Sequence, residues 1–235
     1  MRIALVTEQA ASSATRTAEP AASTDLPGHA LRVTALGRAL ADLGHQVTVY
    51  ARRDAAAQRG PVALAAGCTT EYLPAGPATP LAEEQFLPHL SAFSAQLAQR
   101  LRQRRPDVVH AHYWTGGLAA LAATRGLDVP VVQTFHSLGS AEQRYRGTQS
   151  DSSGARARLE PAIARSVSAV LAGCSAELSD LTRLGVPRTS IRVVPSGVDT
   201  ATFGPTGPVA RRNPMICAIA SNNPRSLVCF AIGAS

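Results

Sequence analysis

Short apolar runs that alternate with longer amphipathic segments constrain the fold of this chain more than any other feature of its 235 residues. Runs such as RIALVT and VPVVQT are typical of buried strands, and apolar residues at helical spacing follow most of them. This alternation predicts an α/β fold with one Rossmann-like domain and a mostly parallel, doubly wound sheet. The predicted strands are 2–7, 46–51, a short one at 69–73, one that begins at Asp107, 129–134, 168–172 and 191–194.

Helices are predicted between these strands from the spacing of leucine, alanine and phenylalanine. The segment 81–105 is expected to be one long helix, which Pro88 kinks and in which Phe93 and Leu97 share an apolar face. Gly44 is expected to end the helix before the second strand. The hydroxyls of Thr115 and Ser175 are expected to cap the starts of two later helices.

The charge balance is strongly basic, with a net charge of +7 and a pI of about 10.0. Every base is an arginine, and only the segment from Arg100 to Arg105 clusters them, so we expect no nucleic-acid partner. The four cysteines show neither a CxxC pair nor metal-ligand spacing, which indicates free thiols in a reducing compartment. No signal peptide and no apolar run of membrane-spanning length is recognised, and a cytoplasmic protein is therefore expected.

The segment PDVVHAHYWTGG, residues 106–117, carries the strongest site candidate. Its pattern predicts a buried strand, with four candidate residues toward its carboxyl end: His110, His112, Tyr113 and Trp114. Ligands of open α/β sheets bind outside the carboxyl ends of the strands, so this polar cluster is expected to face a ligand. Because the two histidines alternate along the strand, one of them is expected to face the core or a helix, and His112 is preferred as the site residue.

A long loop, residues 8–28, follows the first strand and ends at Gly28, just before a helix. A glycine at this place lets a phosphate approach the free N–H groups of the helix start. The loop lacks the G-x-G-x-x-G pattern of dinucleotide-binding proteins, and an ordinary turn glycine explains Gly28 equally well.

Five segments in order resemble a known family: RIALVTE, RALADLGHQVTVYARR, PDVVHAHYWTGG, VPVVQTFHSLG and IRVVPSGVDTATFGP, together spanning residues 1 to about 205. They resemble the N-terminal, acceptor-side half of a family 4 retaining glycosyltransferase of the GT-B fold. The HAHYW segment and the long first loop look most like the sucrose-phosphate synthase and mycothiol glycosyltransferase branch.

The resemblance implies transfer of a sugar from a nucleotide diphosphate sugar to a sugar or sugar-phosphate acceptor, without a metal. It places Gly28 near the donor phosphates and His112, the catalytic candidate, by the donor sugar. It further implies that His110, Tyr113 and Trp114 support His112, and that Thr134 and His136 line the acceptor side. Arg158 and Glu160 match a charged pair of the family. They read equally well as an exposed ion pair, and Pro161 biases Glu160 away from helix.

The end of the chain departs from the family pattern. We divide the chain into a glycosyltransferase domain, 1–205, and a linker remnant with a disordered or frameshifted tail, 206–235, because the composition changes near Asn213. The family's donor-binding half would follow at this point, so we expect the chain to be inactive alone. The alternatives are a non-catalytic sugar- or phosphate-binding module, docking to a separately encoded donor domain, and peripheral membrane contact through Arg100 to Arg105.

Overall fold

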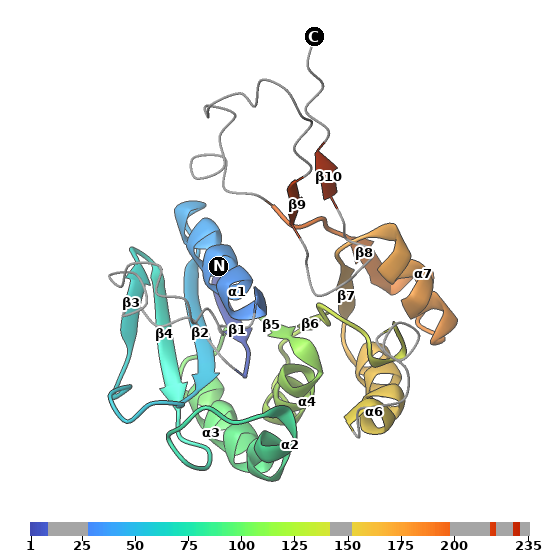
Figure 1. Ribbon diagram of the computed structural model, residues 1–235. Coiled ribbons are helices and arrows are strands. Elements are labelled where there is room, and N and C mark those ends of the chain that lie inside the picture. Colours follow the sequence, from blue (N-terminus) through green and yellow to red (C-terminus); the bar gives the residue numbers. More distant parts are fainter. Residues whose placement is uncertain (9–27, 142–151, 198–216, 220–227, 231–235) are drawn as a thin grey trace.

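A computed structural model describes residues 1–8, 28–141, 152–197, 217–219 and 228–230, and gives the backbone alone for 28–31, 152–154 and the last two ranges. Its centre is an eight-stranded sheet in the order β3-β4-β2-β1-β5-β6-β7-β8 (Figure 1). All neighbouring strands are parallel except β3 and β4. The strands are β1 (Arg2–Val6), β2 (Gln46–Arg52), β3 (Val62–Ala65), β4 (Cys68–Leu73), β5 (Val108–His112), β6 (Val131–Thr134), β7 (Ala169–Ala172) and β8 (Ile191–Val193). This sheet confirms the predicted fold class.

Helices connect the strands and cover both faces of the sheet. They are α1 (Gly28–Asp42), α2 (Glu83–Phe86), α3 (Leu90–Gln103), α4 (Tyr113–Ala123), α6 (Ser152–Ser166) and α7 (Ser175–Arg183), with 3-10 turns at Leu87–His89 and Arg188–Ser190. Figure 1 shows α1 lying across the strands on one side, and α3 and α4 on the other. None of the helices in the described ranges is long and apolar enough to cross a membrane.

The core consists of two apolar layers, one on each face of the sheet. Ile3 and Leu5 of β1 pack in the layer with Val33 of α1, whereas Ala4 and Val6 pack in the layer with α3 and α4. Successive residues of a strand point to opposite faces, so a strand buried on both sides needs an unbroken apolar run. This requirement explains why RIALV, rather than an alternating pattern, forms a central strand.

Several local predictions are wrong. The segment 81–105 is not one helix: a 3-10 turn that contains Pro88 separates α2 from α3. Thr115 does not cap α4, because the helix starts two residues earlier and His112 occupies the N-cap position. Cys174, rather than Ser175, precedes α7 as its N-cap and accepts a hydrogen bond from Glu177 N. Gly44 does end the α1 segment as predicted, with a φ of 85°.

Three strands, in two places of the chain, have no counterpart among the predicted ones. The first is β3, which pairs antiparallel with β4 through an irregular register at Ala63 and Ala65. The second is a pair of three-residue strands in the C-terminal segment, β9 (Cys217–Ile219) and β10 (Val228–Phe230), which pair antiparallel.

Candidate functional site

Three histidines form a stack at the carboxyl ends of β5 and β6. His110 and His112 both come from β5, with their ring centroids 4.1 Å apart. The ring of His136, from the segment after β6, stacks on His112 at a centroid distance of 5.2 Å. Residues two apart on a strand point to the same face, so both β5 histidines lie on one side of the sheet. His112 is the more buried of the two, at 2% exposure.

Hydrogen bonds join the histidines of β5 to residues on and after β6. His112 Nδ1 lies 3.0 Å from His136 Nε2, and His110 Nε2 lies 2.8 Å from Thr134 Oγ1. One of the two nitrogens between His112 and His136 must carry the proton that the other accepts, so the tautomers of these rings are coupled. Desolvation lowers the pKa of His110 to about 4, which keeps its ring neutral at physiological pH.

The backbone is strained at two places beside this stack. Tyr113 and His136 have φ values of 65° and 63°, and they are the non-glycine residues with positive φ in the described part of the chain. Such a conformation costs about 1–3 kcal/mol and is found most often at functional sites. Tyr113 directly follows His112 and His136 contacts it, so both strained backbone positions adjoin the proposed catalytic residue.

The two aromatic residues after His112, Tyr113 and Trp114, lie in different environments. Trp114 is buried at 1% exposure and belongs to the apolar core. Tyr113 is half-buried: its hydroxyl donates to Glu83 Oε2 at 2.7 Å, and the Arg156 guanidinium lies 5.0 Å from its ring centroid. Tyr113 is therefore the member of the pair that remains at the site, and Trp114 contributes packing.

The charged pair in α6 differs from the predicted one. Glu160 pairs with Arg156, whose Nε lies 2.9 Å from Glu160 Oε1, and both side chains are buried. Arg158 is exposed. Glu160 lies inside the helix although Pro161 follows it, so the bias of a residue before proline does not interrupt α6. Residues four apart share a helix face, and this spacing could have identified Arg156 from the sequence.

The Arg156–Glu160 pair holds the segment that carries His136. Both oxygens of Glu160 accept from Gly139 N, at 3.2 and 2.9 Å, and Arg156 Nη2 donates to the carbonyl and hydroxyl of Ser137. A Cβ on Gly139 would lie 2.9 Å from Arg156 Cβ, so only a glycine allows this approach. The ion pair thus ties the loop after β6 to α6.

A second residue that the sequence reasoning missed is Glu8, which follows β1. It is 7% exposed, and its Oε2 accepts from the Thr115 hydroxyl at 3.3 Å. Burial raises the pKa of Glu8 to about 7; the hydrogen bond from Thr115 opposes this, nearby Glu83 adds to it and Arg52 opposes it. Glu8 comes one residue after a predicted strand, at the edge of the sheet where ligands bind. This position could have identified it from the sequence as a site candidate.

The comparisons with known proteins agree with this geometry. A family model described as Glycosyltransferase Family 4 matches residues 28–202. The chain belongs to this family. The D-inositol 3-phosphate glycosyltransferase of Xylanimonas cellulosilytica is 34% identical over 190 residues, which cover 78% of this chain and 45% of the relative. The enzyme of the same name from Acidothermus cellulolyticus is 32% identical over 189 residues, covering 77% and 42%.

The sucrose-phosphate synthase of Thermosynechococcus elongatus has the same fold, with a TM-score of 0.72 at 23% identity, covering 85% of this chain and 49% of that one. These matches confirm both the predicted family and the branch to which the sequence was compared. The family 4 chain spans slightly under half the length of the curated relatives.

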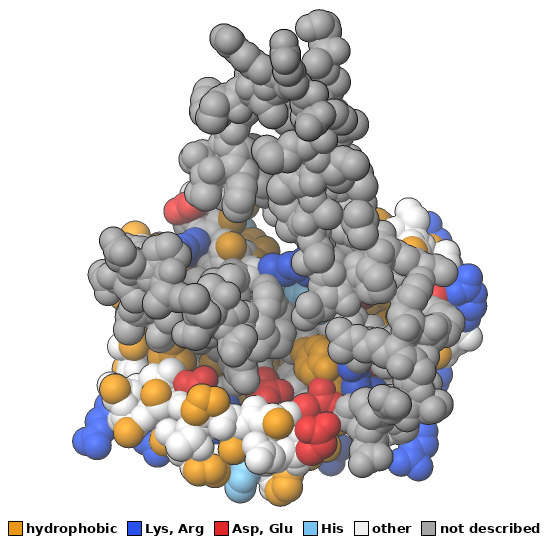
Figure 2. Space-filling view, in the orientation of Figure 1, with side chains coloured by type: hydrophobic (Ala, Val, Ile, Leu, Met, Phe, Trp, Pro, Cys, Tyr) orange, Lys and Arg blue, Asp and Glu red, His pale blue; other side chains and the backbone are white. Residues whose placement is uncertain are grey.

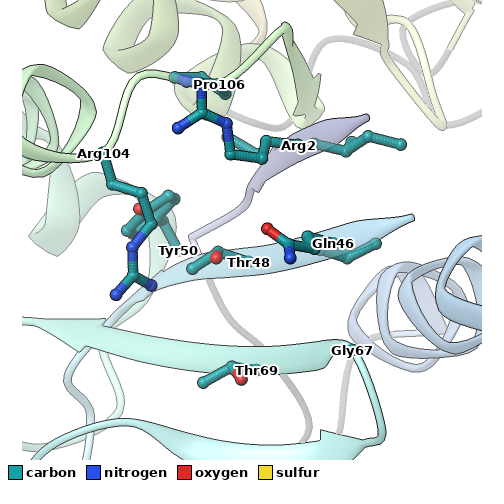
Figure 3. A pocket seen from close by; sticks show the side chains of 11 residues that line it. Arg2, Gln46, Thr48, Tyr50, Gly67, Thr69, Arg104 and Pro106 are labelled. Atoms are coloured by element: carbon teal, nitrogen blue, oxygen red, sulfur yellow. The ribbon is translucent and has the colours of Figure 1, made fainter. Parts of the chain in front are cut away.

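Two cavities of the family 4 chain, of about 250 and 330 Å³, lie away from the histidines. The smaller is lined by residues where β1, β2 and β4 begin, with Arg2, Thr48, Thr69 and Arg104 around it (Figure 3). This smaller cavity is at the edge of the sheet opposite to His112. The surface near the site is acidic instead: acidic side chains gather near α2, which carries Glu83 and Glu84 (Figure 2).

Gly28 is the first residue of α1, as the phosphate hypothesis requires. Most of the loop before it, residues 9–27, lies outside the described residues, so the site geometry includes no contact of that loop. Among the described residues, no three histidine, cysteine or carboxylate side chains are arranged to hold a metal ion together.

Proposed function

We propose that this chain is the acceptor-binding half of a retaining glycosyltransferase that transfers a sugar from a nucleotide diphosphate sugar to a sugar phosphate, without a metal. The observation that carries the proposal is the His110–His112–His136 stack at the carboxyl edge of the sheet, in a chain of Glycosyltransferase Family 4. The names of the relatives support a phosphorylated inositol as the acceptor class.

In this proposal His112 contacts the transferred sugar. Its Nδ1 lies 3.0 Å from His136 Nε2, which fixes the plane in which the imidazole meets the sugar. His136 and the neutral His110 orient the ring, and Thr134 holds His110. The half-buried ring of Tyr113 offers an apolar face against which a sugar ring can pack.

The donor half is supplied from elsewhere in this proposal, either by further chain or by a separately encoded domain. The chain spans 45% of its Xylanimonas relative, and the groups that neutralise a departing diphosphate are assigned to the other half. Gly28 at the start of α1 is the part of this chain proposed to lie near those phosphates. The chain alone is therefore expected to bind acceptor and to show no turnover.

Peripheral membrane contact through Arg100 to Arg105 remains a weaker proposal. The apolar residues Phe93, Leu97 and Leu101 of α3 are buried in the core, which leaves this helix no apolar face for a bilayer. Arg100 Nε lies 3.2 Å from Glu71 Oε2, and Arg105 donates to the Asp128 carbonyl. Arg104 Nη1 also lies 3.9 Å from Glu71 Oε1, so the support for contact with anionic lipid is charge attraction by the exposed Arg102.

The test is a calorimetric titration of the chain with D-inositol 3-phosphate, with unphosphorylated inositol as the comparison ligand. We expect D-inositol 3-phosphate to bind and unphosphorylated inositol not to bind. We expect His136→Ala, on the proposed acceptor side, to weaken binding of the phosphate ester at least about tenfold, which corresponds to the loss of one hydrogen bond to a charged group. His45→Ala is the matched control, because His45 precedes β2 at the opposite edge. Equal binding by the two variants would contradict the assignment of the site.

A further inference from the structure

Two carboxyl groups hold the first turn of α4, the helix that begins directly after His112. The Thr115 hydroxyl donates to Glu8 Oε2 at 3.3 Å, and the Tyr113 hydroxyl donates to Glu83 Oε2 at 2.7 Å. The two donors are the first and third residues of α4, whereas the two acceptors are Glu8, two residues after β1, and Glu83 of α2. Contacts from two other parts of the chain therefore hold the turn between β5 and α4 in place.

The first turn of α4 is tightly packed against β1. A Cβ on Gly116 would lie 3.0 Å from the carbonyl oxygen of Val6. Trp114 is 1% exposed and Glu8 is 7% exposed. Glu8 cannot turn out into solvent without leaving this packing. A change in its charge must therefore move the groups that contact it. The Thr115 hydroxyl, which donates to Glu8, is one of these groups.

The charged groups that face Glu8 come from two directions. Glu83 of α2 is negative and opposes ionisation of Glu8, whereas Arg52 at the end of β2 favours it. The Arg52 guanidinium is already engaged with the carbonyls of Arg53, Pro77 and Thr79, so it is held in place rather than drawn to Glu8. Burial outweighs both neighbours and raises the pKa of Glu8 to about 7.

We propose that Glu8, acting through Thr115, is a positioning residue for His112, and that the gain or loss of its proton resets the first turn of α4. The neutral carboxyl suits the dry site beneath the helix. The carboxylate accepts more strongly from the Thr115 hydroxyl and is repelled by Glu83, which shifts the turn that places His112. The proposal rests on the proposed function in one respect: it makes the neutral form of Glu8 the one in which His112 meets the sugar.

The experiment is an NMR titration of the whole chain between pH 5.5 and 8.5. We expect the amides of Tyr113 and Thr115 and the imidazole of His112 to shift together with a midpoint near 7. In Glu8→Gln this step disappears, and at pH 8 its spectrum in this region resembles that of the wild type at pH 5.5. Glu71→Gln is the control, because Glu71 faces Arg100 away from the site.

Thr115→Val tests the link separately. In this variant we expect the Glu8 side-chain carbon to titrate still, while His112 no longer follows it. If Glu8→Gln retains the step at His112, or if Thr115→Val leaves His112 following Glu8, the proposal is wrong.

A parallel titration with D-inositol 3-phosphate at pH 6 and 8 separates this proposal from the proposed function. If the coupled step is present but the ligand does not bind at either pH, the acceptor assignment fails and the positioning role stands. If the ligand binds equally at both pH values in wild type and in Glu8→Gln, the positioning role fails and the acceptor assignment stands.

Discussion

Removal of the Glu160 charge is the perturbation whose consequence the structure defines most closely. The side chains of Arg156 and Glu160 are 3% and 1% exposed, and the atoms that join them are 2.9 Å apart. In Glu160→Gln the amide oxygen still accepts from Gly139 N, but Arg156 becomes a buried cation without its counter-charge. Breaking a buried pair in this way typically costs about 3–5 kcal/mol, and we expect about 3 because hydrogen-bonding capacity is retained.

The assay is urea unfolding followed by tryptophan fluorescence. Trp114 is the sole tryptophan of the chain and is 1% exposed, so its emission reports loss of the core that includes α4 and α6. For a domain of this size a loss of about 3 kcal/mol corresponds to a fall in Tm of roughly 6 to 12 °C. Arg158→Ala is the control, because Arg158 is exposed on the same helix and its loss should change stability by less than about 0.5 kcal/mol.

The result that would refute this reasoning is a Glu160→Gln variant as stable as Arg158→Ala. It would mean that Arg156 finds solvent or another partner at no cost, and that the pair does not hold the loop after β6. A destabilised variant should also weaken binding of D-inositol 3-phosphate in the native state, because Ser137 and Gly139, which follow His136 in this loop, are both anchored by the pair.

Two further predictions concern stability. Glu8 has a pKa of about 7 when folded, against 4.5 for an ordinary glutamate, so the stability that its neutral form retains below pH 4.5 is lost as pH rises to 7, by at most ~3 kcal/mol. Glu8→Gln should therefore be more stable than wild type at pH 8 and no more stable near pH 4.5; an advantage that is independent of pH in urea unfolding would contradict this. Gly117→Ala should cost about 1–3 kcal/mol, because its Cβ would overlap Gln133 Oε1 and lie 2.8 Å from Ile163 Cγ2. Gly44→Ala, at φ 85° with no atom within 4 Å, should cost only about 1 kcal/mol, and equal losses in thermal unfolding would show that overpacking is not the cause.

The fold was predictable because strand and helix periodicity are local properties. The apolar runs at β1, β2, β6, β7 and β8 agree with the predicted strands to within two residues. The failures were local as well. Pro88 is expected to kink one long helix, yet it lies in a 3-10 turn that separates two helices. Pro161 biases Glu160 away from helix, yet α6 is uninterrupted there, and Ile163 and Ala164 of the same helix pack in the core.

Some of the predicted site residues lie at the site, and others do not. His110, His112, Tyr113, Thr134 and His136 all lie at the carboxyl edge, as the strand order along the chain requires. Trp114 lies in the core and Arg158 in solvent. The phase of a helix decides which side it presents, and a two-residue difference between Arg156 and Arg158 moves a guanidinium from the core to the surface.

The sequence by itself determined that the chain forms a parallel α/β sheet and that its histidines end a central strand, since both follow from the order and period of apolar residues. Only the tertiary structure decided which side chains meet. His112 is paired in register with Thr134, which brings His136 of the next segment onto its ring, and the close approach of α4 to β1 brings Thr115 onto Glu8. The physical reason is that contacts between residues 24 and 107 positions apart depend on strand register and helix packing, which no local pattern encodes.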